Sequence, residues 1–153
     1  MRRTTPILLA LVASAVVPGA GCRPSAEPDD AVAGEVAPPI EWRSASSADG
    51  TFFVRWRPLL EPIPLADPFD VEVEVWADDS MAVPARFDRI LVDAGMPHHR
   101  HGMNVAPEIG PDGPARWIAR GMLFHMPGRW QLYVDLIEDG RLERSQWSMW
   151  LSG

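Results

Sequence analysis

Apolar and polar side chains alternate along much of the chain beyond residue 38. In the clearest run, Phe69, Val71 and Val73 fall on one side of the alternation, and Asp70 and Glu72 fall on the other. A period of two is typical of a β-strand that turns one face toward a core. The same pattern recurs in five further segments, at residues 52–57, 86–93, 116–124, 130–136 and 145–151. The chain is therefore predicted to consist mainly of strands.

Turn-forming residues separate the strand-like segments. Glycine and proline cluster at residues 110–114 and 127–128, and the pair Asp139 and Gly140 is a strong hairpin signal. About seven strands at this spacing, without a helical run, predict an all-β, immunoglobulin-like two-sheet β-sandwich, and a mostly closed barrel is the alternative. The inward face of residues 116–124 stays open, because large apolar side chains occupy both faces.

The N-terminal segment resembles a bacterial lipoprotein signal. Two arginines follow the first methionine, and residues 7–17 are apolar but too short to span the ~30 Å hydrocarbon core of a membrane. Small residues then lead to Cys22, the only cysteine. We expect residues 1–21 to be removed and Cys22 to carry the lipid. An ordinary secretory signal, cut after Ala20, is the alternative.

The region after the signal divides into a linker and a domain. Residues 22–38 hold the lipidated cysteine and then few large apolar side chains, which predicts a flexible linker. The folded domain is expected to cover residues 39–153. Arg23, rather than an aspartate, follows Cys22, which resembles sorting to the outer membrane. The predicted location is the bacterial cell envelope, with a lipid anchor in the outer membrane and the domain facing the periplasm.

Composition and charge narrow the function. Apolar residues make up 46% of the 153 residues, which is enough for a packed core. The formal net charge of −7 argues against a surface for nucleic acid or for an anionic membrane. A single cysteine excludes an internal disulfide and a cysteine-based zinc site. No Ser-His-Asp arrangement, phosphate-binding glycine loop or carboxylate pair stands out, so we predict that the chain is not an enzyme.

Histidine and methionine gather in two short segments. His98, His99 and His101 lie together in the first, and His125 lies in the second. Four of the seven methionines fall in the same region, at positions 96, 103, 122 and 126. Imidazole is a borderline ligand and thioether a soft one, and their mixture without carboxylates favours copper, especially Cu(I). Zinc, bound through histidine alone, is the alternative.

The predicted fold brings these two segments together. Residues 104–124 are expected to form a hairpin, and a pairing of Ile109 with Ala115 would place His99 across from His125. A slip of one residue would put the two imidazoles on opposite faces. The residues predicted to bind copper are His99, His101, Met103, His125 and Met126.

Several residues of this region also have a structural interpretation, in which Met126 and Pro127 would simply shape a turn. Met122 is expected to lie in the core, while Met96 is a further candidate thioether. His125 would donate a hydrogen bond to a backbone carbonyl, and Asp93 would either orient a histidine or cap the end of a strand. The histidine loop would then be a docking surface, or a pH-sensitive one.

Three segments stand out, and the two that contain Met-Pro are fairly specific. They are Ile-Pro-Leu-Ala-Asp-Pro-Phe at 63–69, Val-Asp-Ala-Gly-Met-Pro at 92–97 with His99 and His-Gly-Met at 101–103, and Gly-Met-Leu-Phe-His-Met-Pro-Gly-Arg-Trp at 121–130. Together they resemble the YtkA-like domain family, which is related to FixH-like proteins, over roughly residues 50–137. His98 departs from the family pattern, because it stands where a spacer, often glycine, is usual.

The resemblance implies an extracytoplasmic β-sandwich that is often tethered to a membrane. FixH-like relatives are linked to cation transport and to the assembly of cytochrome oxidases, whereas YtkA-like members have no established activity. We therefore predict an accessory module that binds copper for delivery, storage or sensing, with a protein partner in metal handling or respiratory oxidase assembly.

The alternative is a protein-interaction lipoprotein that binds no metal. Its histidine-rich loop would be a structural feature or a docking surface. The seven tryptophans exceed what one core of this size needs, so exposed ones, such as Trp150, would mark a surface for a partner.

Overall fold

The computed structural model describes residues 38–153. The predicted signal peptide, the predicted lipid site at Cys22 and the linker up to residue 37 lie outside the described residues. None of the described residues belongs to a helix that is long and apolar enough to cross a membrane.

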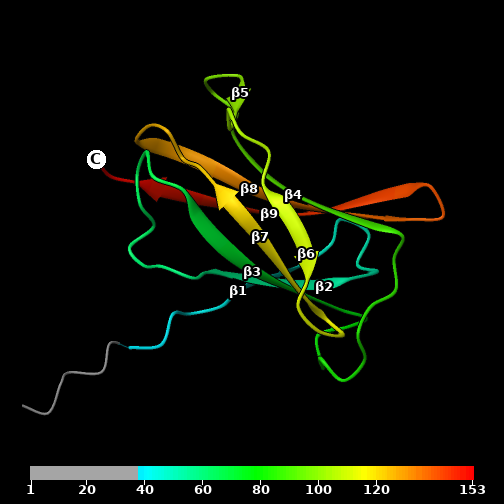
Figure 1. The fold of residues 1–153 in the computed structure, drawn as a ribbon. Helices are drawn as coiled ribbons and strands as arrows, with labels where there is room; N and C mark the ends of the chain where they lie inside the picture. Colours follow the sequence, from blue (N-terminus) through cyan, green and yellow to red (C-terminus); the bar gives the residue numbers. More distant parts are fainter. Residues whose placement is uncertain (1–37) are drawn as a thin grey trace, which may run out of the picture. The chain divides into compact units, whose positions relative to one another are not determined.

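The described residues fold into nine strands arranged as two antiparallel sheets (Figure 1). Sheet A has the strand order β1-β2-β3-β7-β6, and sheet B has the order β5-β4-β8-β9. The strands are β1 (Arg43–Ser46), β2 (Phe53–Pro58), β3 (Phe69–Trp76), β4 (Arg89–Met96), β5 (His101–Gly102), β6 (Glu108–Pro111), β7 (Arg116–Met122), β8 (Gly128–Glu138) and β9 (Arg141–Leu151).

This architecture confirms the predicted all-β sandwich of two sheets. The strands number nine in residues 38–153 rather than about seven, because two short edge strands, β1 and β5, extend the sheets. The order β2-β3-β7-β6 beside β4-β8-β9 corresponds to the A-B-E-D and C-F-G order of immunoglobulin-like sandwiches. That correspondence supports the immunoglobulin-like assignment, which remains a prediction.

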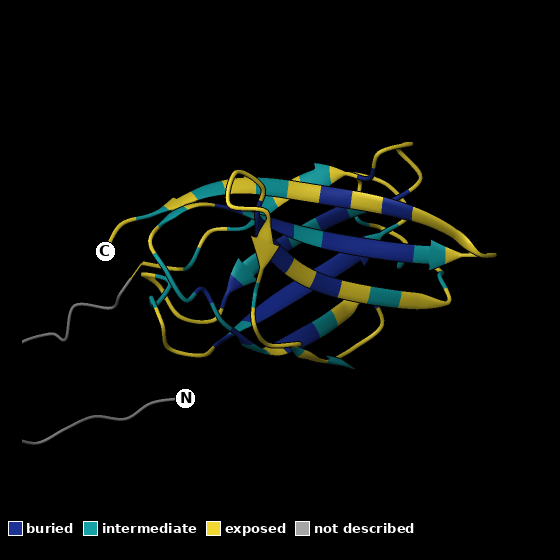
Figure 2. Cartoon of the chain, turned by 90° about the horizontal axis from the view of Figure 1, so that it is seen from above, coloured by how far each residue is buried: buried dark blue, intermediate teal, exposed yellow. Residues whose placement is uncertain are grey.

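The core lies between the two sheets and follows the predicted alternation. Figure 2 shows buried residues concentrated along the central strands, while the loops are exposed. Val71 and Val73 of β3 face the interior with Leu132 and Val134 of β8, and all four are fully buried. The turn at Asp139 has φ of 49° and is followed by Gly140 at 76°, as a tight two-residue hairpin requires. Both predictions, the inward rows and this hairpin, are confirmed.

The predicted register of the hairpin before β7 is wrong. Ile109 pairs with Ala119, not with Ala115, and β6 begins only at Glu108. The turn closes later than expected, because the Asp112 N–H donates to the carbonyl of Arg116 at 2.8 Å. Histidines 99 and 101 therefore do not belong to this hairpin.

A β-bulge at the end of β7 sets the direction of the chain that leads to His125. The register between β3 and β7 shifts between Phe69 and Val71, so that Ala119 and Met122 both reach the interior although they are three residues apart. Gly121 has φ of 76° at this point, which glycine adopts readily, and its N–H donates to a carboxylate oxygen of Asp70. The bulge turns the following residues across the end of the sandwich.

Candidate metal centre

The first histidine segment forms the tip of the β4–β5 hairpin, which stands out from the sandwich in Figure 1. Met96 pairs with His101, and the Arg100 N–H closes the turn on the Met96 carbonyl at 2.9 Å. Arg100 takes the left-handed conformation, with φ of 58°. A Cβ at Gly102 would lie 3.1 Å from the carbonyl oxygen of Ala94, so glycine lets the two strands approach closely.

The second segment connects β7 to β8 across the same end of the sandwich. The carbonyl of Phe124 accepts a hydrogen bond from the Ala66 N–H at 2.8 Å, which ties this loop to the 59–68 loop. The indole N–H of Trp130 donates to the carbonyl of Met126 at 3.0 Å, which closes the loop over the start of β8. His125 lies between these two anchors and is half-buried.

The four imidazoles form a continuous row. Ring centroids are 5.1 Å apart between His98 and His99, 5.7 Å between His99 and His101, and 5.2 Å between His101 and His125. The structure therefore brings His99, His101 and His125 together as predicted, although by a different strand pairing. His98, at the outer end of the row, belongs to the same group.

These separations match the spacing of imidazoles that share an ion. Two imidazoles bound to one ion at about 2 Å have ring centroids roughly 5 Å apart. Among residues 38–153, however, no three histidine, cysteine, aspartate or glutamate side chains are arranged so that they could hold one metal ion. The row thus offers pairs of imidazoles, and a third ligand for the same ion would have to be a methionine thioether.

The Nδ1 atoms of the two inner imidazoles, His101 and His125, differ in their surroundings. Nδ1 of His101 lies 3.2 Å from the carbonyl oxygen of Gly102. Because that oxygen can only accept, a hydrogen bond at this contact uses Nδ1 as the donor, and Nε2 is then the nitrogen open to an ion. Nδ1 of His125 is buried and has no hydrogen-bond partner among the described residues. A buried nitrogen without a partner is costly, so an ion bound there would be stabilising.

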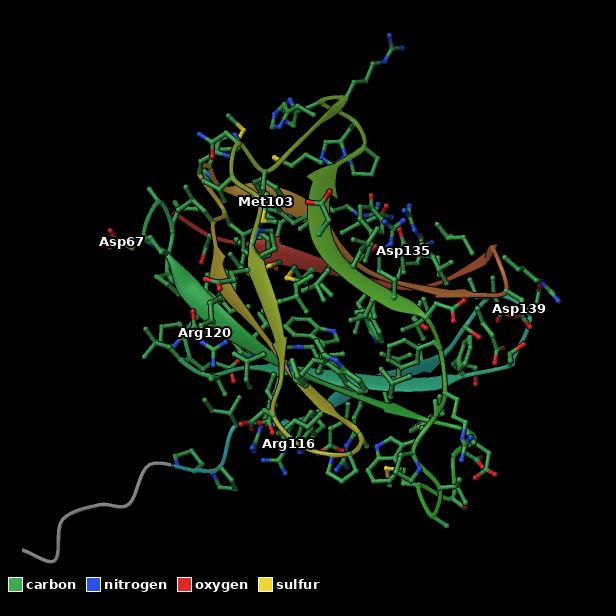
Figure 3. All side chains as sticks on the ribbon, turned by 45° about the vertical axis from the view of Figure 1, so that its right-hand side comes forward. Asp67, Met103, Arg116, Arg120, Asp135 and Asp139 are labelled. Atoms are coloured by element: carbon green, nitrogen blue, oxygen red, sulfur yellow. The ribbon has the colours of Figure 1, made fainter. Side chains whose placement is uncertain are left out.

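The thioethers differ in access. Met103 is half-buried, and its Sδ accepts a hydrogen bond from the Leu123 N–H at 3.4 Å, two residues before His125. Figure 3 shows Met103 below the projecting β4–β5 hairpin. Met126 is also half-buried and packs against the core. Both sulfurs therefore belong to the segments that carry the imidazoles.

The other two methionines lie in the core. Met122 is fully buried, as predicted. Met96 is fully buried too, and its methyl group would lie 2.7 Å from a Cβ added at Gly128, so its role as a further thioether ligand stays a prediction. Val92, Ala94 and Met96 continue one inward row of β4, and this alternation, which runs up to Pro97, is the signal that could have placed Met96 inside.

One buried aromatic ring, that of Trp130, packs against both inner imidazoles. Trp130 is fully buried, and its ring centroid lies 5.3 Å from that of His125 and 6.3 Å from that of His101. Phe124, also fully buried, packs on Trp130 at 4.8 Å. The alternation of residues 130–136 predicts Trp130 in the core row of β8 but gives no signal for its contact with the histidines, which depends on the β4–β5 pairing.

Asp93 does not orient a histidine in the described structure. Its carboxylate accepts a hydrogen bond from the Ala94 N–H at 2.7 Å, and it pairs in register with Tyr133 on sheet B. Because β4 continues to Met96, Asp93 lies within the strand and does not cap its end either.

Comparisons of the chain with protein-family models, with curated proteins and with solved structures find no match. The resemblance to the YtkA-like family therefore stays a prediction, and the chemistry of the row is the basis for a functional proposal.

Proposed function

We propose that the chain is a membrane-anchored, extracytoplasmic accessory module that binds copper as cargo through the His/Met cluster, for delivery, storage or sensing. The cluster comprises His99, His101, Met103, His125 and Met126. The anchor is the lipid on Cys22, in the outer membrane of a bacterial cell envelope, with the domain facing the periplasm. The partner is a protein of metal handling or oxidase assembly, and the module has no catalytic step of its own.

This proposal is carried by Nδ1 of His125, which is buried and has no hydrogen-bond partner within residues 38–153, on a ring whose centroid lies 5.2 Å from that of His101. The available donors are imidazole pairs with thioethers in the same two segments. Soft and borderline donors of this kind favour Cu(I) over harder cations, whereas zinc sites use nitrogen, oxygen and thiolate ligands. The exposure of His99 and His101 gives a partner direct access to the cargo.

The alternative function is a protein-interaction lipoprotein without metal. One observation favours it: no three His, Cys, Asp or Glu side chains in residues 38–153 are arranged around a common ion position. Trp150 is 73% exposed, which marks a surface for a protein partner in either case.

Competition titrations with chromogenic Cu(I) and Cu(II) chelators test the proposal on the full chain. We expect the wild type to compete for both ions, and the double variant His99→Ala/His101→Ala to lose most of its affinity for each, because imidazole binds both oxidation states. Arg100→Gln is the matched control, since it changes the same turn without removing an imidazole. Equal affinities in the wild type and the double variant would overturn the copper proposal in favour of the alternative.

A further inference from the structure

The row of imidazoles runs from solvent toward the interior. His98 and His99 are exposed at the tip of the hairpin, His101 is exposed at its base, and His125 is half-buried against Trp130. The centroid spacing within the row stays between 5.1 Å and 5.7 Å. Every step along the row is therefore close to the spacing of roughly 5 Å between imidazoles that share an ion.

The row divides into two pairs with different surroundings. The inner pair, His101 and His125, packs against Trp130 and has the Met103 thioether in the adjoining segment. Its buried nitrogen, Nδ1 of His125, has no hydrogen-bond partner among the residues that the structure describes. The outer pair, His98 and His99, consists of neighbouring residues in an exposed turn. These surroundings would favour retention of a soft ion at the inner pair and faster exchange at the outer pair.

We propose that the cluster holds Cu(I) at two positions: an outer position on His98 and His99 that acquires the ion, and an inner position on His101 and His125 that retains it. This inference rests on the proposed copper function and assigns His98, the residue that departs from the family pattern, a role of its own. His99 connects the positions, because it lies within 5.1 Å of His98 and 5.7 Å of His101 between ring centroids.

Transfer between the positions is a ligand exchange without redox chemistry. One Cu–N bond to an inner imidazole forms before the last Cu–N bond to an outer imidazole breaks, and the ion remains Cu(I) throughout. Each imidazole binds through a deprotonated nitrogen, so any proton it carried is released to solvent as the bond forms. In the reverse direction, the same exchange presents the ion to a partner at the exposed tip.

The experiment loads the full chain with Cu(I) from a chromogenic chelator under anaerobic conditions. Bound ions per chain are measured at saturation, and tryptophan emission is followed during loading. In the wild type we expect two ions. The tighter one changes the emission, because Trp130 touches both inner imidazoles. The change should disappear in Trp130→Phe, which retains an aromatic ring at this position.

The variants separate the two positions. His98→Gln should bind one ion with the inner affinity unchanged, and its loading should slow by about tenfold, since a tethered outer ligand raises the effective concentration of ion at the inner pair. His101→Gln should also bind one ion, more weakly and without a change in emission. Circular dichroism checks that each variant is folded, and Arg100→Gln should behave as wild type.

The number of bound ions and the loading rate distinguish failure of the two-position inference from failure of the proposed copper function. If the wild type binds a single ion and His98→Gln matches it in stoichiometry and loading rate, the two-position inference is wrong, while the proposed copper function stands. If the wild type binds no Cu(I), the proposed function itself is wrong. Two ions that both persist in His98→Gln would likewise overturn the assignment of the outer position.

Discussion

The nitrogen and sulfur atoms of the cluster differ in how much free energy the binding of an ion would contribute at each of them. An exposed imidazole such as His98 gives up hydrogen bonds to water when it binds, so its net gain is small. Nδ1 of His125 is buried without a partner among the described residues, and a bound ion would satisfy it at no such cost. Met103 keeps its sulfur near the second segment through the Leu123 N–H.

The Met103 thioether should determine which oxidation state is preferred. Met103→Leu keeps the volume but removes the soft ligand, so we expect the affinity for Cu(I) to fall by about tenfold or more, and that for Cu(II) to change little. Competition titrations with chelators for each ion measure the difference. The fold should survive, because leucine replaces methionine in a half-buried site with a cost of about 1 kcal/mol.

Met122→Leu is the matched control for this exchange. Met122 is fully buried in the core, so the same change of side chain there should leave both affinities at the wild-type level. Equal losses of Cu(I) and Cu(II) affinity in Met103→Leu would contradict a role for its sulfur as a ligand.

At the scale of elements, the candidate centre joins the two sheets. Its first segment is the β4–β5 hairpin of sheet B, and its second continues from β7 of sheet A. Neither segment holds all of the imidazoles, so the row exists only when β4 pairs with β8 and the β7–β8 connection crosses from sheet A to sheet B. The contacts that hold the sandwich together therefore also maintain the spacing of the ligands.

One such contact fastens the loop between β1 and β2 to β9. The carboxylate of Glu143, 5% exposed, accepts hydrogen bonds from the hydroxyls of Ser47 and Thr51, both at 2.6 Å. These bonds, first that of Ser47 and then that of Thr51, hold the pKa of the Glu143 carboxyl below its ordinary value. The charged form is therefore favoured in the folded state.

The lowered pKa of Glu143 predicts a sensitivity to acid. Its contribution to stability is present above the ordinary pKa, near pH 4, and is lost as the pH falls through the lower pKa of the folded state. Glu143→Gln should cost about 1 to 2 kcal/mol at pH 7. In acid the variant and the wild type should converge. Urea unfolding at both pH values, followed by tryptophan fluorescence, measures the gap.

Glu138→Gln provides the comparison for this substitution. Glu138 is an exposed carboxyl at the end of β8, so its change to glutamine should leave the unfolding free energy nearly constant at both pH values. A gap between Glu143→Gln and wild type that persists unchanged in acid would show that the charge of Glu143 does not stabilise the loop.

For the whole molecule, the predicted lipid on Cys22 decides where the candidate centre operates. Cys22→Ser should move the protein from the membrane fraction to the soluble fraction, because a thioether-linked lipid cannot form without the thiol. Mass spectrometry of the wild type in the membrane fraction should find residues 1–21 absent and a lipid mass on Cys22. An intact Cys22 thiol on a soluble protein would contradict the prediction.

The strands and their inward rows could be predicted from the sequence, because alternation is a local property of successive side chains. The run around Val71 and the row from Trp130 to Leu136 are examples, and both are buried as expected. The hairpin at Asp139 and Gly140 was equally readable, because these residue types accept the positive φ angles of a tight turn. The gathering of histidine and methionine in two segments was visible as well.

Partners and register depended on the tertiary structure. A period of two shows which side chains of a strand share a face, but it does not show which strand lies beside it. For this reason the predicted pairing placed His99 in the wrong hairpin. The sequence left open which side chains of β7 point inward. The β-bulge opposite Asp70 decides this, and it forms only because β7 pairs with β3.

Burial of charge was decided in the same way. Glu72 and Glu74 lie on the polar side of the β3 alternation, yet they are only 3% and 5% exposed. Their carboxylates form ion pairs with arginines of two neighbouring strands, namely Arg55 and Arg57 of β2 and Arg116 of β7. The spacing of the candidate ligands, the burial of the core methionines and the buried ion pairs all depend on contacts between segments that are distant in the sequence. The sequence alone therefore determined which residues could meet, and the packing of the two sheets decided which of them do.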